Sequence, residues 1–268
     1  MTTHRQYLVN SFAEDGFAGN PAAVCIVDNW PSEAQMQKIA LDNNLSETAF
    51  CLCLCDNSFE PHFHIRWFTP GCEVDLCGHA TLATAFILFK HYFNDARVLH
   101  FKSRSGDLHV RKTDNFAILM DFPSYSLEEV TDEAELKEVE EALGETGKKI
   151  EALYKGIDYV AVLKTAKDVV EFKPDFVKIA SMRGVYNLLI TAKGDKYDFV
   201  SRCFFPKEAI DEDPVTGSAH CTLGPLWAER LGKKELVACQ ASARGGILHL
   251  SVGKDRVTVG GRAVEVYR

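Results

Sequence analysis

An internal repeat, with its two copies about half the chain apart, constrains the fold of this protein more than any other sequence feature. Arg66-Trp67-Phe68-Thr69-Pro70 and Arg202-Cys203-Phe204-Phe205-Pro206 share the pattern Arg-x-Phe-x-Pro, and each closes a strand-like run. Each copy continues through acidic residues to Gly-x-Ala, beginning at Gly78 or Gly217, and then into an apolar run. The prolines of the two copies, at positions 70 and 206, are 136 residues apart, and the glycines, at 78 and 217, are 139 residues apart. Spacing of this length predicts duplication of a whole domain.

Each copy of the repeat predicts a buried helix whose first turn can bind an anion. The first N–H groups of a helix lack partners inside the helix, and the helix dipole adds positive potential there. If the two domains face each other about a pseudo-twofold axis, both helix starts point into one cleft. We therefore expect an inter-domain cleft that binds a carboxylate, or a developing oxyanion, through backbone donors from both sides.

The hydrophobic pattern predicts both strands and helices, arranged in two domains. Residues 82–89 are apolar on nearly every side, which is typical of a helix buried all round. Composition becomes acidic over 123–145, where we expect a linker and a solvated helix, and hence a domain boundary near Pro123. We predict an N-terminal domain over 1–122, with the last strand at about 257–268 as a candidate addition, and a C-terminal domain over 123–256. Pro225 lies inside the second apolar run, so that helix either kinks there or starts nearer Leu223.

Charge and hydropathy restrict the classes of partner. The 268 residues carry a net charge of −8 and have a pI near 5.6, which argues against nucleic acid or an anionic membrane as the main partner. No run approaches the roughly 18 apolar residues of a membrane span. The first residues lack the apolar segment of a signal peptide, and the nine cysteines form no C-x-x-C pair. We therefore expect a cytoplasmic protein with reduced thiols.

The sequence predicts no metal site. His62 and His64 share one face of a predicted strand, but no third ligand lies near them in the sequence. Cys51, Cys53 and Cys55 alternate with leucines and therefore share a face of another strand. Neighbours of this kind are poorly placed for a disulfide, and we interpret them as small apolar residues.

Five residues are candidates for proton transfer: Glu47, His79, Asp211, Glu212 and Asp213. His79 directly follows the first helix-start glycine, and Asp213 comes four residues before the second. Glu47 lies in a turn flanked by apolar residues, where partial desolvation would raise a carboxyl pKa toward neutrality. Asp211 and Glu212 have no such setting, and we interpret them as solvated.

Four motifs resemble the PhzF, or phenazine-biosynthesis-like, family. They are Gly19-Asn20-Pro21-Ala22-Ala23-Val24, Asn44-Leu45-Ser46-Glu47-Thr48-Ala49-Phe50, Arg66-Trp67-Phe68-Thr69-Pro70 leading to Gly78-His79-Ala80-Thr81, and Asp213-Pro214-Val215-Thr216-Gly217-Ser218-Ala219. They occur in the family's order and cover the chain almost end to end. The resemblance implies an α+β fold of the diaminopimelate-epimerase-like type. In that fold, two pseudo-symmetric domains each curl a mostly antiparallel, barrel-like sheet around a central helix, and the active site lies in the inter-domain cleft.

The resemblance also implies a function. Members of the family are isomerases that need no cofactor, and in the best-understood activity a glutamate shuttles a proton between carbons of a dihydro-hydroxyanthranilate. By motif, Glu47 is that general acid/base, while His79 and Asp213 orient the substrate and assist the transfer. The residues implied to hold the substrate's carboxylate or amino group are Ser46, Gly78, Gly217 and Ser218. The implied partners are a small carboxylate-bearing substrate and a second copy of the chain in a homodimer.

Two alternatives stay open. Related epimerases use one cysteine at each helix start, and Cys77 precedes Gly78, but Thr216 precedes Gly217. A two-thiol racemase is therefore disfavoured, whereas a mechanism using Cys77 alone is not excluded. A non-catalytic protein that binds a small anion is the second alternative. Neither the motifs nor the resemblance identifies the substrate, because one fold and one acid/base group can serve different metabolites.

Overall fold

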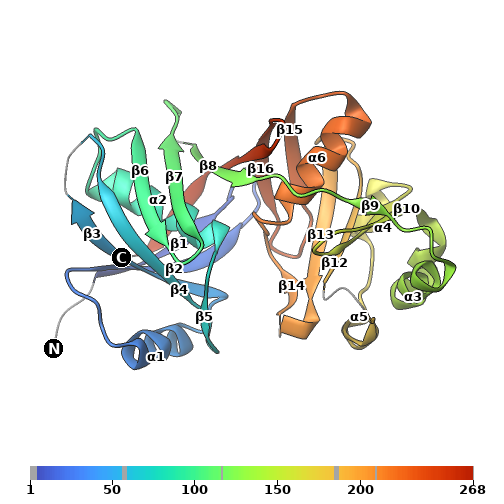
Figure 1. The fold of residues 1–268 in the computed structure, drawn as a ribbon, viewed down its shortest axis with the longest axis horizontal. Coiled ribbons are helices and arrows are strands. Elements are labelled where there is room, and N and C mark those ends of the chain that lie inside the picture. Colours follow the sequence, from blue (N-terminus) through green and yellow to red (C-terminus); the bar gives the residue numbers. More distant parts are fainter. Residues whose placement is uncertain (1–4, 56–58, 116, 184–186, 209, 268) are drawn as a thin grey trace. The chain divides into compact units, whose positions relative to one another are not determined.

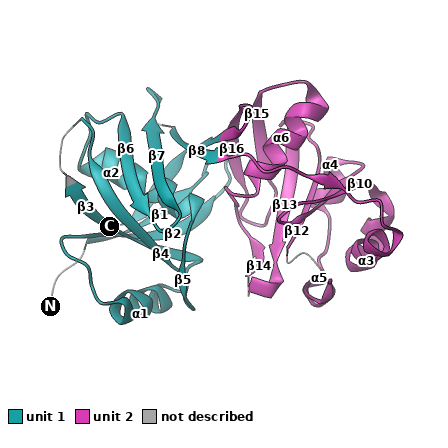
Figure 2. Cartoon of the chain, in the orientation of Figure 1, with its two compact units in different colours: residues 1–122, 258–268 teal, residues 123–257 magenta. Residues whose placement is uncertain are grey.

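A computed structural model describes residues 5–267 except 56–58, 116, 184–186 and 209. The chain divides into two compact units, shown in different colours in Figure 2. Unit 1 consists of Met1–Phe122 and Thr258–Arg268, and unit 2 of Pro123–Val257. Within the described residues, no helix is long and apolar enough to cross a membrane.

Unit 1 is a mixed sheet whose strands lie in the order β18, β1, β2, β3, β4, β6, β7, β8. The β2–β3 and β4–β6 pairs are parallel and the other pairs are antiparallel, while the short β5 pairs with β4. The elements are β1 Arg5–Ser11, β2 Asn20–Val27, α1 Glu33–Asn43, β3 Glu47–Cys55, β4 His62–Phe68, β5 Glu73–Val74, α2 Gly78–His91, β6 Val98–Ser103, β7 Gly106–Lys112, β8 Ile118–Pro123 and β18 Ala263–Tyr267.

Helix α2 is the centre of unit 1 (Figure 1). It contacts β1, β2 and β3, and also β7 and β18 toward the two ends of the strand order, so the sheet curls around it. Every residue from His79 to Phe89 is buried. The prediction of a helix buried all round is therefore confirmed. The other helix, α1, covers part of the opposite face of the sheet, where Met36 and Ala40 pack with Phe50 and Phe68.

Unit 2 has its strands in the order β9, β10, β11, β12, β13, β15, β16, with β11–β12 and β13–β15 parallel. Helix α6 packs on β15 and β16. The elements are β9 Glu128–Glu129, α3 Glu133–Leu143, the 3-10 helix η1 Gly144–Lys149, β10 Ile150–Lys155, β11 Tyr159–Leu163, α4 Ala166–Val170, α5 Phe176–Ser181, β12 Leu188–Lys193, β13 Phe199–Phe205, η2 Pro206–Glu208, β14 Ile210–Asp213, α6 His220–Leu231, β15 Glu235–Gln240 and β16 Gly246–Val252. Strand β17, Arg256–Gly261, begins in unit 2 and continues into unit 1.

The two units repeat one topology. From β1 to β7 in unit 1, successive pairs are antiparallel, parallel, antiparallel, parallel and antiparallel, and the same series runs from β10 to β16 in unit 2. The short β14 pairs with β13 as β5 pairs with β4, and each short strand precedes a helix, α6 or α2. The pseudo-symmetric α+β architecture predicted from the internal repeat is therefore confirmed.

Pro225 lies inside α6, which begins at His220 and not near Leu223. A proline has no N–H to donate to the carbonyl four residues earlier, which here belongs to Cys221. That carbonyl accepts instead from the backbone N–H of Tyr125, at 3.1 Å. The helix thus tolerates the proline because a neighbouring segment supplies the missing donor.

Candidate active site

The end of α1 fixes the position of Glu47. Asn44 ends the helix in the left-handed conformation (φ 48°, ψ 43°), and three residues later Glu47 opens β3. The amide of Asn43 donates to the Thr48 hydroxyl at 2.9 Å and accepts from Gln6 of β1, also at 2.9 Å. These bonds join the helix end to two strands, so the glutamate is held by ordered backbone on both sides.

The start of α2 brings His79 to the same place. The Ser11 hydroxyl donates to the backbone carbonyl of His79 at 2.7 Å, which ties the first turn of the helix to β1. The imidazole is hydrogen-bonded to the backbone of Pro21. Because proline has no N–H, the partner is its carbonyl oxygen and the ring is the donor.

The turn before β2 needs a glycine. Gly19 has φ 69°, and a Cβ there would overlap the carbonyl oxygen of Ser11. Only glycine combines that backbone conformation with so close an approach. The Gly19-Asn20-Pro21 motif therefore has a direct structural role, since it delivers the Pro21 carbonyl to the imidazole.

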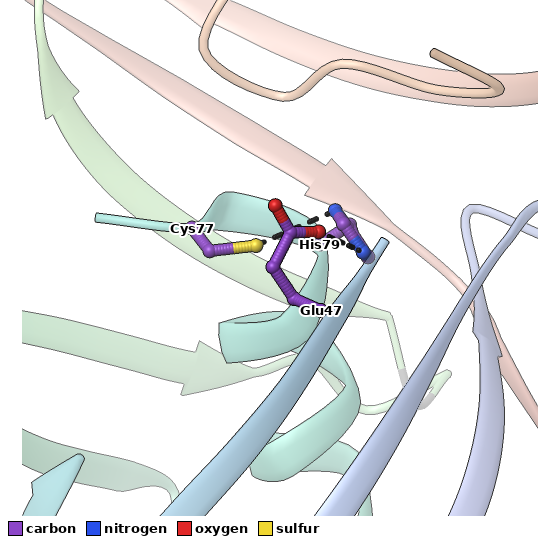
Figure 3. A group of neighbouring side chains, drawn as sticks. All are labelled: Glu47, Cys77 and His79. Atoms are coloured by element: carbon purple, nitrogen blue, oxygen red, sulfur yellow. Dashed lines mark hydrogen bonds and ion pairs between the residues drawn. The ribbon is translucent and has the colours of Figure 1, made fainter. Parts of the chain in front are cut away.

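Glu47, Cys77 and His79 form one cluster (Figure 3). Glu47 Oε2 lies 3.2 Å from His79 Nε2, and Cys77 Sγ lies 3.5 Å from His79 Nδ1. The Glu47 and His79 side chains are only 13% and 6% exposed. Burial lowers the pKa of His79 to about 4, against the raising effect of the Pro21 hydrogen bond, so the ring is neutral at neutral pH. The contact with Glu47 is therefore not an ion pair with imidazolium, although its length would suit one.

A neutral imidazole and a carboxyl group this close must have a proton on one of them. The neutral ring carries a single N–H and the ionised carboxylate carries none. Without a proton on either facing atom, two acceptor atoms would meet at 3.2 Å in a buried place. The two atoms are close, but their contact does not have the geometry of a hydrogen bond. The pair is thus suited to exchange a proton with a third group, which is what general acid/base catalysis needs.

The same three side chains could hold a metal ion. One ligand atom from each of Glu47, Cys77 and His79 lies within 4.8 Å of the others. A thiolate, an imidazole and a carboxylate are all zinc ligands, and three protein ligands with an open fourth position are the usual pattern of a catalytic zinc site. Sequence reasoning missed this set because Glu47 lies far from the other two in the chain.

Unit 2 has a turn at the equivalent position, between β14 and α6. The Thr216 hydroxyl donates to Asp213 Oδ2 at 2.6 Å. The side-chain amide of Gln240 accepts from the Thr216 N–H and donates to the Asp213 carbonyl, both at 2.8 Å. Asp213, Thr216 and Gln240 are all buried, so this turn is rigid and polar. Sequence reasoning singled out Asp213 but missed Gln240, which lies on β15 in no motif.

Both helix starts keep backbone donors without acceptors. In α6 the first bonds run from His220 N–H to the Gly217 carbonyl and from Cys221 N–H to the Ser218 carbonyl. Within the described part of the chain, the N–H groups of residues 217–219 have no acceptor, and the same holds for residues 78–80 at the start of α2. Gly217 is buried whereas Ser218 is exposed, and both Ser46 and Gly78 are half-buried.

A bidentate Arg–Glu pair precedes each helix start. Arg66 donates to both oxygens of Glu73 at 2.7 Å, and Arg202 donates to those of Glu212 at 2.7 and 2.9 Å. The interpretation of Glu212 as solvated is wrong, because its side chain is only 16% exposed and belongs to this pair. Asp211 is exposed, as expected. The partner of Glu212 lies on the neighbouring strand β13, where no local pattern reveals it.

His220 is a buried residue of unit 2 that sequence reasoning missed. Its Nδ1 lies 2.8 Å from the Thr216 carbonyl and must be the donor, while the ring stacks on Phe199. Burial lowers the pKa of His220 to about 4, as it does for His79. Among the described residues its Nε2 has no hydrogen-bond partner. The ring is therefore held neutral beside the turn that carries Asp213.

Comparison with known proteins gives consistent matches over the whole chain. A family model described as phenazine biosynthesis-like protein matches residues 9–268. An uncharacterized isomerase of Pseudomonas aeruginosa is 44% identical, over 96% of this chain and 94% of its own. An uncharacterized isomerase of Halalkalibacterium halodurans is 40% identical, over 100% and 98%. The crystal structure of a PhzF-family protein from Enterococcus faecalis superposes with a TM-score of 0.89 at 46% identity, covering 98% of this chain and 96% of its own. The expected diaminopimelate-epimerase-like fold is thereby confirmed.

Proposed function

The chain belongs to the phenazine biosynthesis-like family, and on that premise we propose that it is a cofactor-independent isomerase of a small carboxylate-bearing metabolite. Its relatives in Pseudomonas aeruginosa and Halalkalibacterium halodurans are named isomerases. The observation that carries the proposal is the 3.2 Å approach of Glu47 to a neutral, buried His79. A simple anion-binding protein has no need of such a proton-exchanging pair.

Glu47 is the general acid/base in this proposal. Its carboxylate takes a proton from one carbon of the substrate, so that a C–H bond breaks and an O–H bond forms. The same O–H then gives its proton to another carbon, and the double bond of the substrate shifts between the two positions. Nothing is oxidised or reduced, and the glutamate returns to its starting state. His79 remains neutral and gives its one N–H to Pro21, so its Nε2 can accept the O–H of Glu47 while the glutamate is protonated.

Backbone donors bind the anionic end of the substrate. Three N–H groups at the start of α2, including those of Gly78 and His79, are available beside Glu47, and the Ser46 hydroxyl lies next to it in the chain. The turn of unit 2 offers the same kind of donors at Gly217 and Ser218. In our proposal Asp213 orients the substrate's amino or hydroxyl group, because Thr216 and Gln240 hold its turn rigid. That both helix starts bind the same substrate molecule stays a prediction, as do the homodimer and the cytoplasmic location.

A thiol mechanism is the second candidate, favoured by the 3.5 Å contact between Cys77 Sγ and His79 Nδ1. In that case the thiolate would take the proton and the imidazole would assist. The internal repeat argues against it, since the residue that corresponds to Cys77 in unit 2 is Thr216, which donates to Asp213 instead. A two-thiol racemase is therefore not supported.

Hydrogen exchange at carbon tests the proposal. The protein is incubated in deuterated water with a panel of small unsaturated amino- and hydroxy-carboxylates, including a dihydro-hydroxyanthranilate, and label entering C–H positions is followed by NMR. We expect exchange of at least one compound, and its loss in Glu47→Gln. Undiminished exchange in that variant would remove Glu47 from its role.

A further inference from the structure

Three histidines line up across neighbouring strands on the solvent-facing side of unit 1. In the parallel β4–β6 pair His62 lies opposite His100, and in the antiparallel β6–β7 pair His100 lies opposite His109. Strands β4 and β6 alternate in burial, with Phe63 and Phe101 turned into the core. His62 and His109 are exposed and His100 is half-buried, so the three rings share the outer face of the sheet.

The rings touch one another directly. His100 Nδ1 lies 2.8 Å from His109 Nδ1, and the two rings meet edge to face with their centroids 4.9 Å apart. The His62 ring stacks on the His100 ring at 4.6 Å, with an interplanar angle of 14°. His64, on the same face of β4, turns away from this group and packs edge-on against Trp30, at 5.0 Å. The cluster therefore consists of His62, His100 and His109, and we call it the histidine row.

The histidine row is not explained by stability alone. Cross-strand pairs on an open sheet face contribute about 0.2–1 kcal/mol each, and aliphatic or aromatic residues would serve as well. A short N–N contact also requires that one ring donate its only N–H to the other. Exposed imidazoles gain little from that arrangement, because water is an equally good partner for them.

We propose that His100 and His109 form a chelating site for a first-row divalent transition-metal ion, with His62 as a third ligand. The two Nδ1 atoms lie side by side in a hydrogen bond, and one ion can bind both once a proton shifts from Nδ1 to Nε2 of one ring and the rings turn so that both lone pairs face the ion. That shift changes no charge. His62 is exposed and must turn about its side-chain bonds, since a stacked ring directs its lone pairs parallel to those of His100 rather than at the same ion.

The distance indicates which ions fit. With metal–nitrogen bonds of about 2.0–2.1 Å, nitrogens 2.8 Å apart subtend an angle of about 85–90° at the ion. This angle belongs to square-planar or octahedral coordination and is narrower than a tetrahedron allows. Imidazole ligands with such geometry are typical of Ni²⁺ and Cu²⁺. We therefore expect Ni²⁺ to bind more tightly than Zn²⁺ at this site.

The surrounding charges are compatible with a cation. Glu60 and Asp107 are acidic residues that interact electrostatically with His100, and their negative charges would favour a bound cation. Lys102, on the same strand as His100, carries a positive charge that would repel a cation, but it lies opposite Asp107 in the β6–β7 register.

The histidine row also completes a pattern that the sequence leaves unfinished. His62 and His64 were expected to lack a third ligand, because none lies near them in the chain. The additional ligands come from β6 and β7, which only the fold places beside β4. Of the two histidines on β4, His62 contacts another ring of the histidine row, whereas His64 packs against Trp30.

Isothermal titration of the full-length protein with Ni²⁺ tests this site without any need for the substrate. Two ligands on one rigid surface raise affinity by about 10²–10⁴ over one, so His100→Ala and His109→Ala should each weaken binding by about 10²-fold. His62→Ala should have a smaller effect. His64→Ala is the matched control, since it removes a histidine from the same strand and face, and its affinity should equal that of the unchanged protein. A parallel titration with Zn²⁺ should give weaker binding.

Cys77→Ser distinguishes the histidine row from the cluster at Glu47. If Ni²⁺ binding is lost in Cys77→Ser and kept in His100→Ala, the ion belongs to the other cluster and the proposal is overturned. Affinity that is unchanged in both His100→Ala and His109→Ala would also overturn it. Both positions are at least partly exposed, so these variants should fold. Thermal unfolding curves of the variants check this. Failure of this site would leave the proposed isomerase function untouched, because the two sets share no residue.

Discussion

His79 Nε2 lies 3.2 Å from Glu47 Oε2, although one residue lies in the first turn of a helix and the other begins a strand. The contact depends on three anchors outside the pair: the Pro21 carbonyl on the imidazole, the Ser11 hydroxyl on the helix start, and the Asn43 amide beside β3. The first anchor orders the imidazole, and the other two order the helix start and the start of β3. The geometry at the carboxyl group is therefore set before any substrate arrives.

Glu47→Gln should abolish turnover and leave the fold intact. The amide is nearly isosteric with the carboxyl but cannot carry a proton between carbons, and general acid/base groups contribute about 10²–10⁴-fold to rate. Deuterium incorporation at carbon measures the loss. Glu128→Gln, an exposed change in the short strand β9, is the control and should exchange label at the original rate.

Cys77→Ser should retain isomerase activity to within a few-fold. Serine keeps the size of the side chain and lies at the helix start, but it cannot form a thiolate at neutral pH. The same exchange assay gives the answer. Loss of all activity here, together with activity retained in Glu47→Gln, would identify the thiol as the base and reverse the assignment.

Thr216→Val should lower activity more than it lowers stability. The change removes the 2.6 Å hydrogen bond to Asp213 and keeps the shape of the side chain, so the carboxylate loses an orienting donor. A comparable fall in Asp213→Asn would indicate that both changes act on one function. Steady-state kinetics and thermal unfolding, measured on the same samples, separate the two effects. Wild-type kinetics in both variants would exclude this turn from the reaction.

Breaking the Arg202–Glu212 pair should destabilise the protein strongly. Glu212→Gln leaves a guanidinium that is 9% exposed without its charge partner, and such losses cost about 3 kcal/mol. Glu73→Gln, in the counterpart pair of unit 1, should cost less, because Arg66 keeps its ion pair with Glu33. Asp42→Asn breaks the exposed Lys38–Asp42 pair and should cost less than about 0.5 kcal/mol. Chemical denaturation measures all three, and equal losses would contradict the burial argument.

Stability should fall as pH decreases from 6.5 toward 4. Both His79 and His220 have a pKa lowered to about 4 by burial, so the unfolded chain binds protons on these rings at higher pH than the folded chain does. Each ring accounts for at most about 3 kcal/mol of the loss. In His220→Gln, the difference in unfolding free energy between pH 7 and pH 4.5 should shrink by about 2 kcal/mol. Chemical denaturation at both pH values measures it, and an undiminished difference would mean that His220 is not the titrating group.

The sequence predicts much of the fold because the relevant signals are local or repeated. The apolar run 82–89 predicts a buried central helix, and the Arg-x-Phe-x-Pro copies predict two related halves. The apolar run and each copy of the repeat span only a few residues, so each can be recognised locally. The sequence does not decide where the second helix starts. A proline inside a helix needs another donor for the carbonyl that it leaves unpaired, and here that donor, Tyr125, lies far from Pro225 in the chain.

The site is predicted less fully because its remaining parts are contacts between distant strands. Glu47, His79 and Asp213 are marked by motifs, whereas Gln240 reaches Asp213 from β15 with no motif of its own. Glu212 has the sequence setting of a solvated loop residue, yet its partner comes from β13. Hydrogen-bond partners brought together by sheet register leave no trace in local composition, and so one sequence alone does not reveal them.

The pairing of β1 with β18 has a consequence for the order in which the protein is made. Leu8 lies opposite Tyr267, so β1 leaves the ribosome long before β18 and waits for it before its outer edge is covered. Unit 2 is continuous in the chain and can fold during that interval. The edge of β1 meanwhile offers unpaired backbone groups to other nascent chains. Slow synthesis, or a stop before β18, should therefore favour aggregation over a soluble truncated product.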